Sequence, residues 1–312
     1  MSRDVAVIVP TLRRPESLAR ALASLQAQVG VKDRLAEIVV IDNDPTGSAQ
    51  ATVGAAVGPV PCRYVHAPVP GVATARNAGL AATNAPLIAF LDDDEAASPG
   101  WLKALLKAQS NTVADVVFGP IQGRAPDGAA WLRPYLEHFF GREGPSEDRL
   151  IDEPFGCGNS LMVRATALPG LAPFDVGADH AGGEDDALFA ALKARGGRFG
   201  WAADAWVEEF APAHRATLAY ALTRAFAYGQ GPSQTAWRRK DPLGVLKWML
   251  VGGAQVLVFG LAAGWAFLTR DPRRAWRLDR AVRGLGKVLW MPGLEPAFYG
   301  QAEMKRLARA RI

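Results

Sequence analysis

The first 120 residues alternate short apolar, β-branched runs with stretches of helical periodicity. The runs predict β-strands at residues 5–9, 37–41, 63–66, 87–91 and 115–118. The clearest helix begins at Pro15, and its apolar residues recur on one face: Leu18, Leu22, Leu25 and Val29. Strands and helices in alternation predict an α/β fold with a mostly parallel, doubly wound sheet flanked by helices. The ligand crevice of such a sheet lies at the carboxyl ends of its strands.

Acidic residues follow the fourth predicted strand, at the crevice end. The apolar run 87–91 leads directly into Asp92, Asp93 and Asp94, an Asp-x-Asp pattern whose mutual repulsion would be costly without a cation. Because alternate residues of an extended segment point the same way, we expect Asp92 and Asp94 to converge. Such a pair suits Mg²⁺ or Mn²⁺, with substrate phosphates completing the octahedron. The alternative is a solvated acidic turn that caps the next helix.

Two further residues are placed to hold a nucleotide. Asp42 ends the second strand beside Thr11 of the first, and its carboxylate could accept a hydrogen bond from the N–H of a uracil ring. Arg76 lies at the start of a predicted helix after Gly71, where a guanidinium that faces the crevice would suit a base or a phosphate. The alternatives are a helix cap for Asp42 and a surface charge for Arg76.

Glycine, proline and aromatic residues become frequent in the second part of the chain. Helices are predicted there at 131–139, 185–193 and 217–228. We expect residues 1–240 to form one domain, with a nucleotide-binding half at 1–120 and an acceptor-side half at 121–240. Residues 241–312 then form a helical appendage.

An apolar segment with basic flanks opens this appendage. The 21 residues 248–268 carry no formal charge, and as a helix they would extend about 31 Å, close to the thickness of a bilayer core. A single crossing would place one basic flank on the wrong side of the membrane. We therefore expect a helix or bent hairpin that enters the cytoplasmic leaflet and returns, with bends at Gly252-Gly253, Gly260 and Gly264. A buried core helix is the alternative.

The net charge of +4 is unevenly distributed. Eleven Lys or Arg and four Asp or Glu follow position 269, so the preceding residues carry a net negative charge. This basic tail favours an anionic membrane surface over a nucleic acid, because it accompanies an apolar run and no recognition module. The two cysteines, Cys62 and Cys157, lack disulfide or zinc spacing and favour a reducing compartment. The run 5–9 is too short for a signal-peptide core, so we expect a cytoplasmic catalytic part.

Several motifs follow one another in a fixed order along the first 190 residues. They are Val7-Ile8-Val9-Pro10-Thr11, Ile41-Asp42-Asn43-Asp44, Ala75-Arg76-Asn77, Phe90-Leu91-Asp92-Asp93-Asp94 and Gly183-Glu184-Asp185-Asp186. As a set they resemble the motifs of family-two inverting glycosyltransferases with the GT-A fold. Residues 92–95, 99–102, 114–120 and 224–230 are similar to bacterial exopolysaccharide glucosyltransferases of the succinoglycan-assembly type.

The resemblance implies a role for each matching position. Nucleotide contacts would fall on Pro10, Thr11, Asp42, Arg76, Asp92 and Asp93. Asp94 would ligate Mg²⁺ or Mn²⁺, and Asp92 would contact the ribose, or the metal through water. Asp185 would be the base that takes the proton of the acceptor hydroxyl, with Glu184 as the fallback base or an acceptor contact. Asn159 would contact the acceptor sugar.

The sequence departs from the family pattern at two places. Many relatives have a histidine metal ligand after the strand that follows the base, whereas residues 205–209 lack histidine and His214, which we expect to be an ordinary surface residue, comes later. The Gln-x-x-Arg-Trp signature of processive synthases is also missing, since Gln234-Thr235-Ala236-Trp237-Arg238 has a different order. We therefore expect one sugar to be transferred per encounter.

Together these features predict a non-processive, inverting, metal-dependent transfer of a sugar from a nucleotide diphosphate, a UDP-sugar, to a lipid-linked or oligosaccharide acceptor. The reaction would serve surface polysaccharide assembly at the inner face of the bacterial cytoplasmic membrane. Two alternatives stay open. A sugar nucleotidyltransferase would need a glycine-rich loop after the first strand, which residues 10–15 lack. A catalytically silent membrane scaffold could bind the nucleotide sugar without turning it over.

Overall fold

The computed structural model describes residues 3–179, 182–296 and 298. Contacts within the chain divide it into two compact units. The first contains the described residues of Met1–Gly123 and Gly141–Phe210, together with Phe298. The second contains Arg124–Phe140 and the described residues of Ala211–Ala297.

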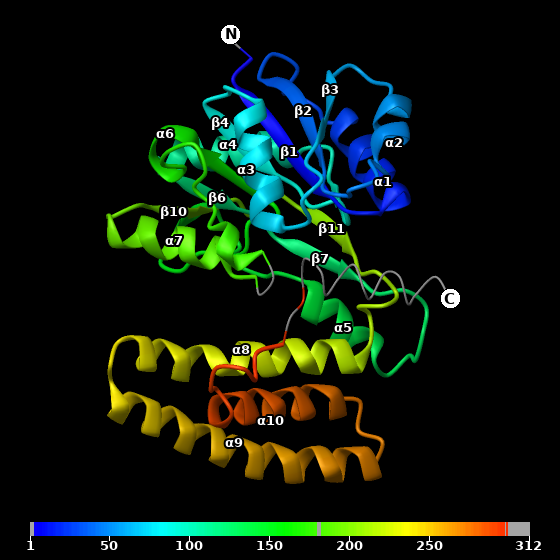
Figure 1. Ribbon diagram of the computed structural model, residues 1–312. Helices are drawn as coiled ribbons and strands as arrows, with labels where there is room; N and C mark the ends of the chain where they lie inside the picture. The colour runs from blue at the N-terminus through cyan, green and yellow to red at the C-terminus, as the bar shows by residue number, and fades with distance from the viewer. Residues whose placement is uncertain (1–2, 180–181, 297, 299–312) are drawn as a thin grey trace. The chain divides into compact units, whose positions relative to one another are not determined.

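The first unit is built on an eight-stranded sheet in the order β3-β2-β1-β4-β9-β6-β10-β8 (Figure 1). Its strands are β1 (Val5–Thr11), β2 (Leu35–Asp42), β3 (Cys62–His66), β4 (Leu87–Phe90), β6 (Val116–Phe118), β8 (Arg149–Ile151), β9 (Ser160–Val163) and β10 (Phe199–Trp201). The first four are mutually parallel, as are β6 and β10, whereas β9 and β8 run antiparallel to their neighbours. Thr11 and Asp42 are register partners, so the ends of β1 and β2 meet at one edge as predicted.

Helices cover both faces of this sheet. They are α1 (Pro15–Gln26), α2 (Gln50–Ala55), α3 (Val72–Ala82), α4 (Trp101–Thr112), α6 (Arg164–Ala167) and α7 (Glu184–Ala194), with a 3₁₀ turn η1 (Val176–Ala178). A three-stranded sheet, β5 (Glu95–Ala97), β11 (Val207–Phe210) and β7 (Ile121–Arg124), completes the unit. The predicted strands and the predicted first helix are therefore present.

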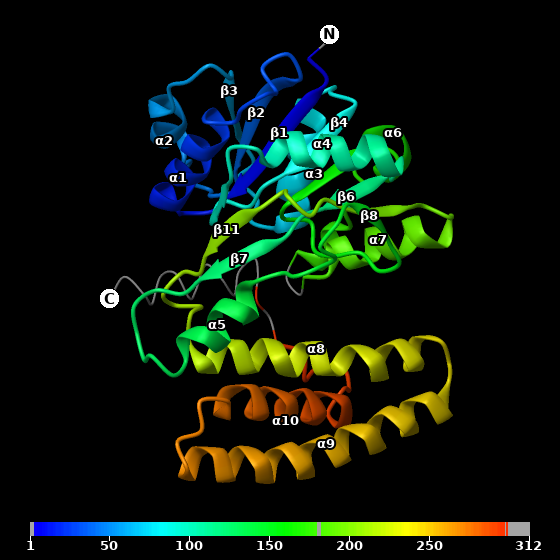
Figure 2. The same ribbon diagram turned by 180° about the vertical axis from the view of Figure 1, so that it is seen from behind.

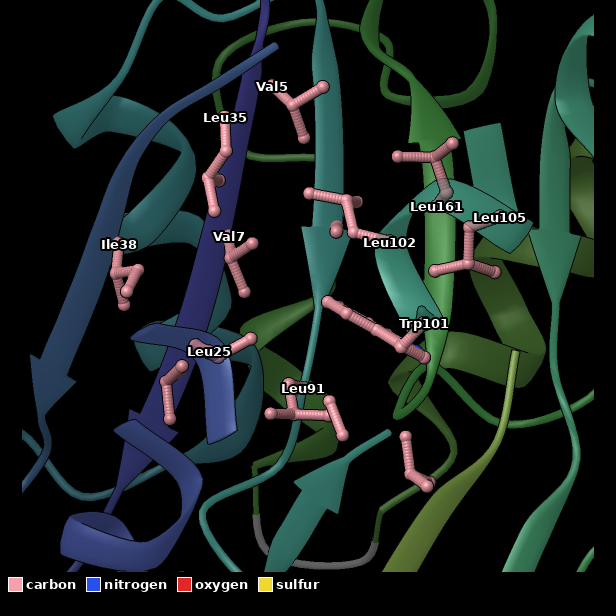
Figure 3. Close-up of a cluster of buried hydrophobic side chains, with 14 of the residues drawn as sticks. Val5, Val7, Leu25, Leu35, Ile38, Leu91, Trp101, Leu102, Leu105 and Leu161 are labelled. Atoms are coloured by element: carbon pink, nitrogen blue, oxygen red, sulfur yellow. The ribbon is translucent and has the colours of Figure 1, made fainter. Parts of the chain in front are cut away.

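Alternation along the central strands produces two separate cores. Val5, Val7 and Val9 of β1 face the helices α1 and α4, where Leu25 and Trp101 are fully buried (Figure 3). The intervening residues of β1 face α3 and α7 instead. This period of two, with both faces apolar, is what a sheet covered by helices on each side requires. Val29 was expected on the apolar face of the first helix, but α1 ends at Gln26 and Val29 is 56% exposed.

The second unit consists of helices α5 (Arg133–Phe140), α8 (Leu218–Arg238), α9 (Pro242–Leu268) and α10 (Arg274–Val288). The last three run side by side in both views (Figures 1 and 2). Glycines allow this close packing: a Cβ on Gly252 of α9 would lie 2.5 Å from the carbonyl oxygen of Gly284 in α10. A Cβ on Gly229 of α8 would likewise lie 2.3 Å from the carbonyl oxygen of Arg283.

Three expectations about this part of the chain need correction. The helix α9 is continuous from Pro242 to Leu268, so a hairpin bent at its glycines is wrong. The buried-core alternative is wrong as well, since large side chains such as Leu250 and Leu261 are about two-thirds exposed. The division of the chain also lies elsewhere than residue 241, because α8 packs along α9 and α10 and belongs with them.

Candidate active site

The acidic run after β4 forms a turn. The N–H of Glu95 donates to the carbonyl oxygen of Asp92 at 3.0 Å, which reverses the chain within four residues. Asp93 and Asp94 both turn to one cation: Nη1 of Arg14 lies 2.8 Å from Asp93 and 2.9 Å from Asp94. The hydroxyl of Thr11 also donates to Asp93 at 2.7 Å. The end of β1 and the acidic turn are thus joined by direct contacts.

Asp92 contacts a different cation. Its carboxylate lies 3.7 Å from Nη2 of Arg76 and its side chain is 42% exposed. Asp92 and Asp94 thus pair with different arginines, and the expected convergence of their carboxylates on one metal ion stays a prediction. The two carboxylates that share a cation are those of Asp93 and Asp94, and burial raises the pKa of Asp93 although Arg14 opposes the rise.

Arg76 links the acidic turn to α7. Its guanidinium is buried, lies over the Phe174 ring at 5.6 Å and forms an ion pair with Glu184. Burial works against the charge, but the nearby carboxylates of Glu184 and Asp92 favour it, and the pKa of Arg76 is raised. The surface-charge alternative for Arg76 is therefore wrong, and the residue is an internal cation between two acidic segments.

The first turn of α7 carries the two predicted base candidates in different surroundings. Glu184 is buried against Arg76, and burial raises its pKa although the Arg76 cation opposes the rise. Asp185 is partly exposed, and its Oδ2 accepts the backbone N–H of Cys157 at 3.0 Å. The carboxylate that solvent or a substrate can reach is thus that of Asp185.

The loop before β9 is held by a residue that sequence reasoning missed. Arg142 donates from Nη1 to the carbonyl oxygen of Gly158 and from Nη2 to that of Gly156, each at 3.0 Å. Its guanidinium also lies 5.3 Å from the centre of the Phe155 ring. Nothing in the sequence pattern distinguishes this arginine from the other basic residues.

Glu95 is a second residue that the sequence did not single out. It is buried, and its carboxylate accepts a hydrogen bond from the N–H of Asp92 at 2.9 Å, which stabilises the acidic turn. Burial raises the pKa of Glu95 well above its ordinary value, and the nearby charge of Asp92 adds to the rise. Its position directly after the acidic run was the only available signal.

Two other predicted contacts lie in the interior. The carboxylate of Asp42 accepts the N–H groups of Asp44 and Ala49 at 3.1 and 2.7 Å, and Ala49 immediately precedes α2. The N-cap residue of α2 is Ala49, and no side chain caps this helix, so the structure does not support the capping alternative for Asp42. Pro10 pairs in register with Ile41 of the neighbouring strand. Both residues help to shape the end of the sheet.

Asn159 differs most from its predicted place. Its side chain is fully buried and adopts the left-handed conformation, with φ at 51°, which asparagine tolerates better than most residues. The amide donates to the carbonyl oxygens of Pro120 and Ala205 at 2.8 and 3.0 Å and accepts from the indole of Trp101 at 2.7 Å. These bonds occupy the polar atoms that a sugar contact would need.

The carboxylates of the acidic turn bear on whether the site could hold a divalent ion. Within the described part of the chain, no group of three or more His, Cys, Asp or Glu side chains is arranged to hold a metal. Mg²⁺ usually takes one or two protein carboxylates and completes its shell with water and phosphate oxygens. Asp93 and Asp94, with the partly exposed Asp92 beside them, fit this type of site and not a cage made only of protein ligands.

The geometry and the chain's relatives agree on the class of protein. Residues 6–169 match the model of glycosyl transferase family 2, and the chain belongs to this family. It is a glycosyltransferase with the GT-A fold. The chain is 32% identical over 300 residues to the succinoglycan biosynthesis protein ExoM of Rhizobium meliloti (strain 1021), which covers 95% of this chain and 96% of that protein.

Two further similarities are more limited. Validoxylamine A glucosyltransferase of Streptomyces hygroscopicus subsp. limoneus is 33% identical over 158 residues, 48% of this chain and 34% of that protein. Among solved structures, the mannosyltransferase PcManGT of Pyrobaculum calidifontis, in complex with GDP-Man and Mn²⁺, superposes with a TM-score of 0.61 at 17% identity. The match covers 93% of this chain and 88% of that one, and it supports the fold alone.

Proposed function

We propose that this glycosyltransferase transfers a single sugar from a UDP-sugar to a lipid-linked saccharide, with inversion at the anomeric carbon. The observation that carries the proposal is the bridge made by Arg76 between Asp92 of the acidic turn and Glu184 of α7. It puts the residues suited to a diphosphate and the residues suited to proton removal around one buried cation.

Asp185 is the proposed base. An inverting transfer needs one carboxylate to remove the proton of the acceptor hydroxyl while that oxygen attacks the anomeric carbon, and the diphosphate leaves from the opposite face. The partial exposure of Asp185 favours it over Glu184, whose charge is already paired with Arg76. The N–H of Cys157 holds the carboxylate in one orientation.

The nucleotide side of the site is proposed to lie at the ends of β1 and β4. Thr11, Arg76 and the acidic turn would bind the donor, with Asp94 as the metal ligand and Asp92 at the ribose or at a metal-bound water. A bound Mg²⁺ or Mn²⁺ would neutralise charge on the leaving diphosphate. The Mn²⁺ in the PcManGT complex supports the use of such an ion.

The acceptor class rests on relatives and on the C-terminal helices. The similarity to ExoM, a succinoglycan biosynthesis protein, supports a role in exopolysaccharide assembly. The apolar helix α9 and the basic residues around it support the proposal that the enzyme acts at the cytoplasmic face of a membrane, where a lipid-linked acceptor would be available.

A thermal-shift screen of UDP, GDP, ADP and dTDP with and without Mn²⁺ tests the donor and the metal together. We expect UDP with Mn²⁺ to raise the melting temperature most. Stabilisation by another nucleotide would replace the donor assignment, and stabilisation by none would contradict the proposed site.

Family membership argues against a nucleotidyltransferase, and the absence of pyrophosphate among the products would exclude it. UDP binding without transfer to any acceptor would favour the silent scaffold.

A further inference from the structure

We propose that α9 lies flat in the surface of an anionic phospholipid bilayer, anchored through one apolar stripe, and neither crosses the membrane nor enters it and returns. The inference deepens the membrane location within the proposed function. It rests on the geometry of the second unit alone and can be tested without sugar transfer.

The stripe consists of exposed large apolar side chains on one face of α9. They are Leu243, Leu246, Leu250, Leu257, Val258, Leu261, Trp265 and Leu268. Apart from the adjacent Leu257 and Val258, their spacings are three, four or seven residues, and at 3.6 residues per turn all eight lie on one side of the helix. Exposures of 53% to 82% along the whole helix make this a continuous apolar surface, far more than scattered surface leucines.

The opposite face of α9 is occupied by protein. Val245, Gly252, Ala263 and Ala266 are buried there. The contact at Gly252 is with the backbone of Gly284, so α9 and α10 touch without intervening side chains. This packing fixes the rotation of α9 and therefore fixes which of its faces is available to a partner.

Charges on α10 exclude a spanning orientation. The guanidinium of Arg280 lies 5.2 Å from the centre of the Phe259 ring, and Nη1 of Arg277 contacts the carbonyl oxygen of Ala262 at 3.4 Å. Phe259 is next to the midpoint of the uncharged segment 248–268. If α9 crossed the bilayer, these arginines would lie near its centre, where charged side chains are strongly disfavoured.

The continuity of α9 excludes a re-entrant hairpin. Its 27 residues form one helix of about 40 Å. A segment that enters a leaflet and returns must reverse direction, and the described backbone from Pro242 to Leu268 has no such reversal. A flat orientation keeps all the backbone hydrogen bonds of the helix and brings the full length of the stripe into contact with acyl chains.

Basic residues at both ends identify the occupant as an anionic membrane. Arg238, Arg239 and Lys240 precede α9, Lys247 lies near the start of its exposed face, and Arg270 and Arg273 follow its end. Anionic headgroups around the apolar stripe would complement them. A second copy of the chain would instead bring one basic end against another in either a parallel or an antiparallel pairing, so the charges disfavour a dimer at this face.

Flotation of the full-length protein with vesicles tests the lipid partner. Vesicles of phosphatidylcholine alone and of phosphatidylcholine with phosphatidylglycerol provide the two arms. We expect binding to the mixed vesicles, and Leu257→Glu and Leu261→Glu should each weaken it about tenfold. Leu171→Glu, at an exposed leucine of the first unit, is the matched control and should bind as the parent protein does. Equal binding of all four proteins to the mixed vesicles would overturn the proposal.

The depth of the helix distinguishes the three orientations. Single substitutions Leu246→Cys, Leu257→Cys and Leu268→Cys would carry an environment-sensitive fluorophore, with the unsubstituted protein measuring labelling of the native thiols. Quenchers at defined acyl positions should report similar shallow depths for all three. If the label at position 257 lay deepest, the segment would be a hairpin. If the depth changed steadily from position 246 through 257 to 268, the helix would cross the bilayer. Either result overturns the flat orientation.

Light scattering tests whether a second copy of the chain, and not a membrane, covers the stripe. If Leu257→Glu converts a dimer into a monomer and leaves vesicle binding unchanged, the stripe is an interface between copies and the proposal is wrong. Nucleotide binding provides the separate control, because Leu257→Glu should keep the thermal shift that UDP gives the parent protein. Loss of vesicle binding with an intact UDP shift isolates the anchor from the proposed transfer site.

Discussion

The backbone N–H of Cys157 donates a hydrogen bond of 3.0 Å to Oδ2 of Asp185, which ties the first turn of α7 to the loop before β9. The loop therefore sets the direction of the proposed base. We expect a change that frees the loop to alter the direction of Asp185, whereas Asp93 and Asp94 keep their own contacts with Arg14.

The substitution Asp185→Asn should abolish proton removal and leave the shape of the site. We expect kcat to fall about 10²- to 10⁴-fold, the range associated with general base catalysis. The thermal shift with UDP and Mn²⁺ should be unchanged. Asp186→Asn, at the exposed neighbouring residue, is the matched control and should keep nearly full activity. Full activity in Asp185→Asn would remove the base assignment.

Arg142→Lys should weaken the loop while keeping the charge. Lysine cannot donate to the carbonyl oxygens of Gly156 and Gly158 with the two nitrogens of a planar fork. We expect the free energy of unfolding, measured by urea denaturation, to fall by about 1.5 to 3 kcal/mol, the range for a hydrogen bond to a charged group. The decrease in kcat should exceed any change in the KM for the donor. If the KM for the donor changed more than kcat, Arg142 would instead contribute to nucleotide binding.

Arg14→Gln should leave Asp93 and Asp94 without their shared cation. Removing one partner of a buried ion pair typically costs about 3 to 5 kcal/mol, and the 15% exposure of Arg14 places the expected loss at the lower end. Mn²⁺ should stabilise this variant more than the parent protein, because the ion replaces the missing positive charge. Equal Mn²⁺ shifts in the two proteins would show that the metal does not use these carboxylates.

Gly252→Ala should destabilise the second unit, since its methyl group would lie 2.5 Å from the carbonyl oxygen of Gly284. A loss of about 1 to 3 kcal/mol is expected for such overpacking. The matched control is Gly253→Ala, where the added methyl group meets nothing within 4 Å and should stabilise the helix by about 0.5 to 1 kcal/mol. Differential scanning calorimetry of the two variants gives the comparison.

The reactivity of Cys62 should depend steeply on pH. Burial raises the pKa of its thiol to about 11, so little thiolate is present near neutrality. Iodoacetamide should modify it slowly at about pH 8 and faster as the pH approaches 11. Because the folded thiol holds its proton more tightly than an unfolded one, this group adds stability that is complete below the unfolded pKa and is lost above it. Rapid alkylation at neutral pH would contradict the burial.

Much of the fold could be predicted because it follows from residue periodicity. The apolar run of β1, alternating between two covered faces, and the helical spacing from Leu18 to Leu25 are local signals that the structure retains. The acidic run was also visible. Its partners in space were not, because the turn closed by Glu95 brings Asp93 and Asp94 to Arg14 and brings Asp92 to Arg76, and both arginines are remote along the chain.

The residues that the sequence missed are single charges without a pattern. Arg14 and Arg142 become part of the site only because distant segments bring carboxylates or carbonyl groups to them. The continuity of α9 was missed for a related reason. Its glycines weaken an isolated helix, but Gly252 packs against α10, and that contact is not encoded in the local sequence.

The buried amide of Asn159 joins three segments that are remote along the chain, through Trp101, Pro120 and Ala205. None of them can separate from the others while its three bonds persist. During denaturation we therefore expect α4 and the connections that follow β6 and β10 to lose protection against amide hydrogen exchange in one cooperative step, with the same midpoint for all three.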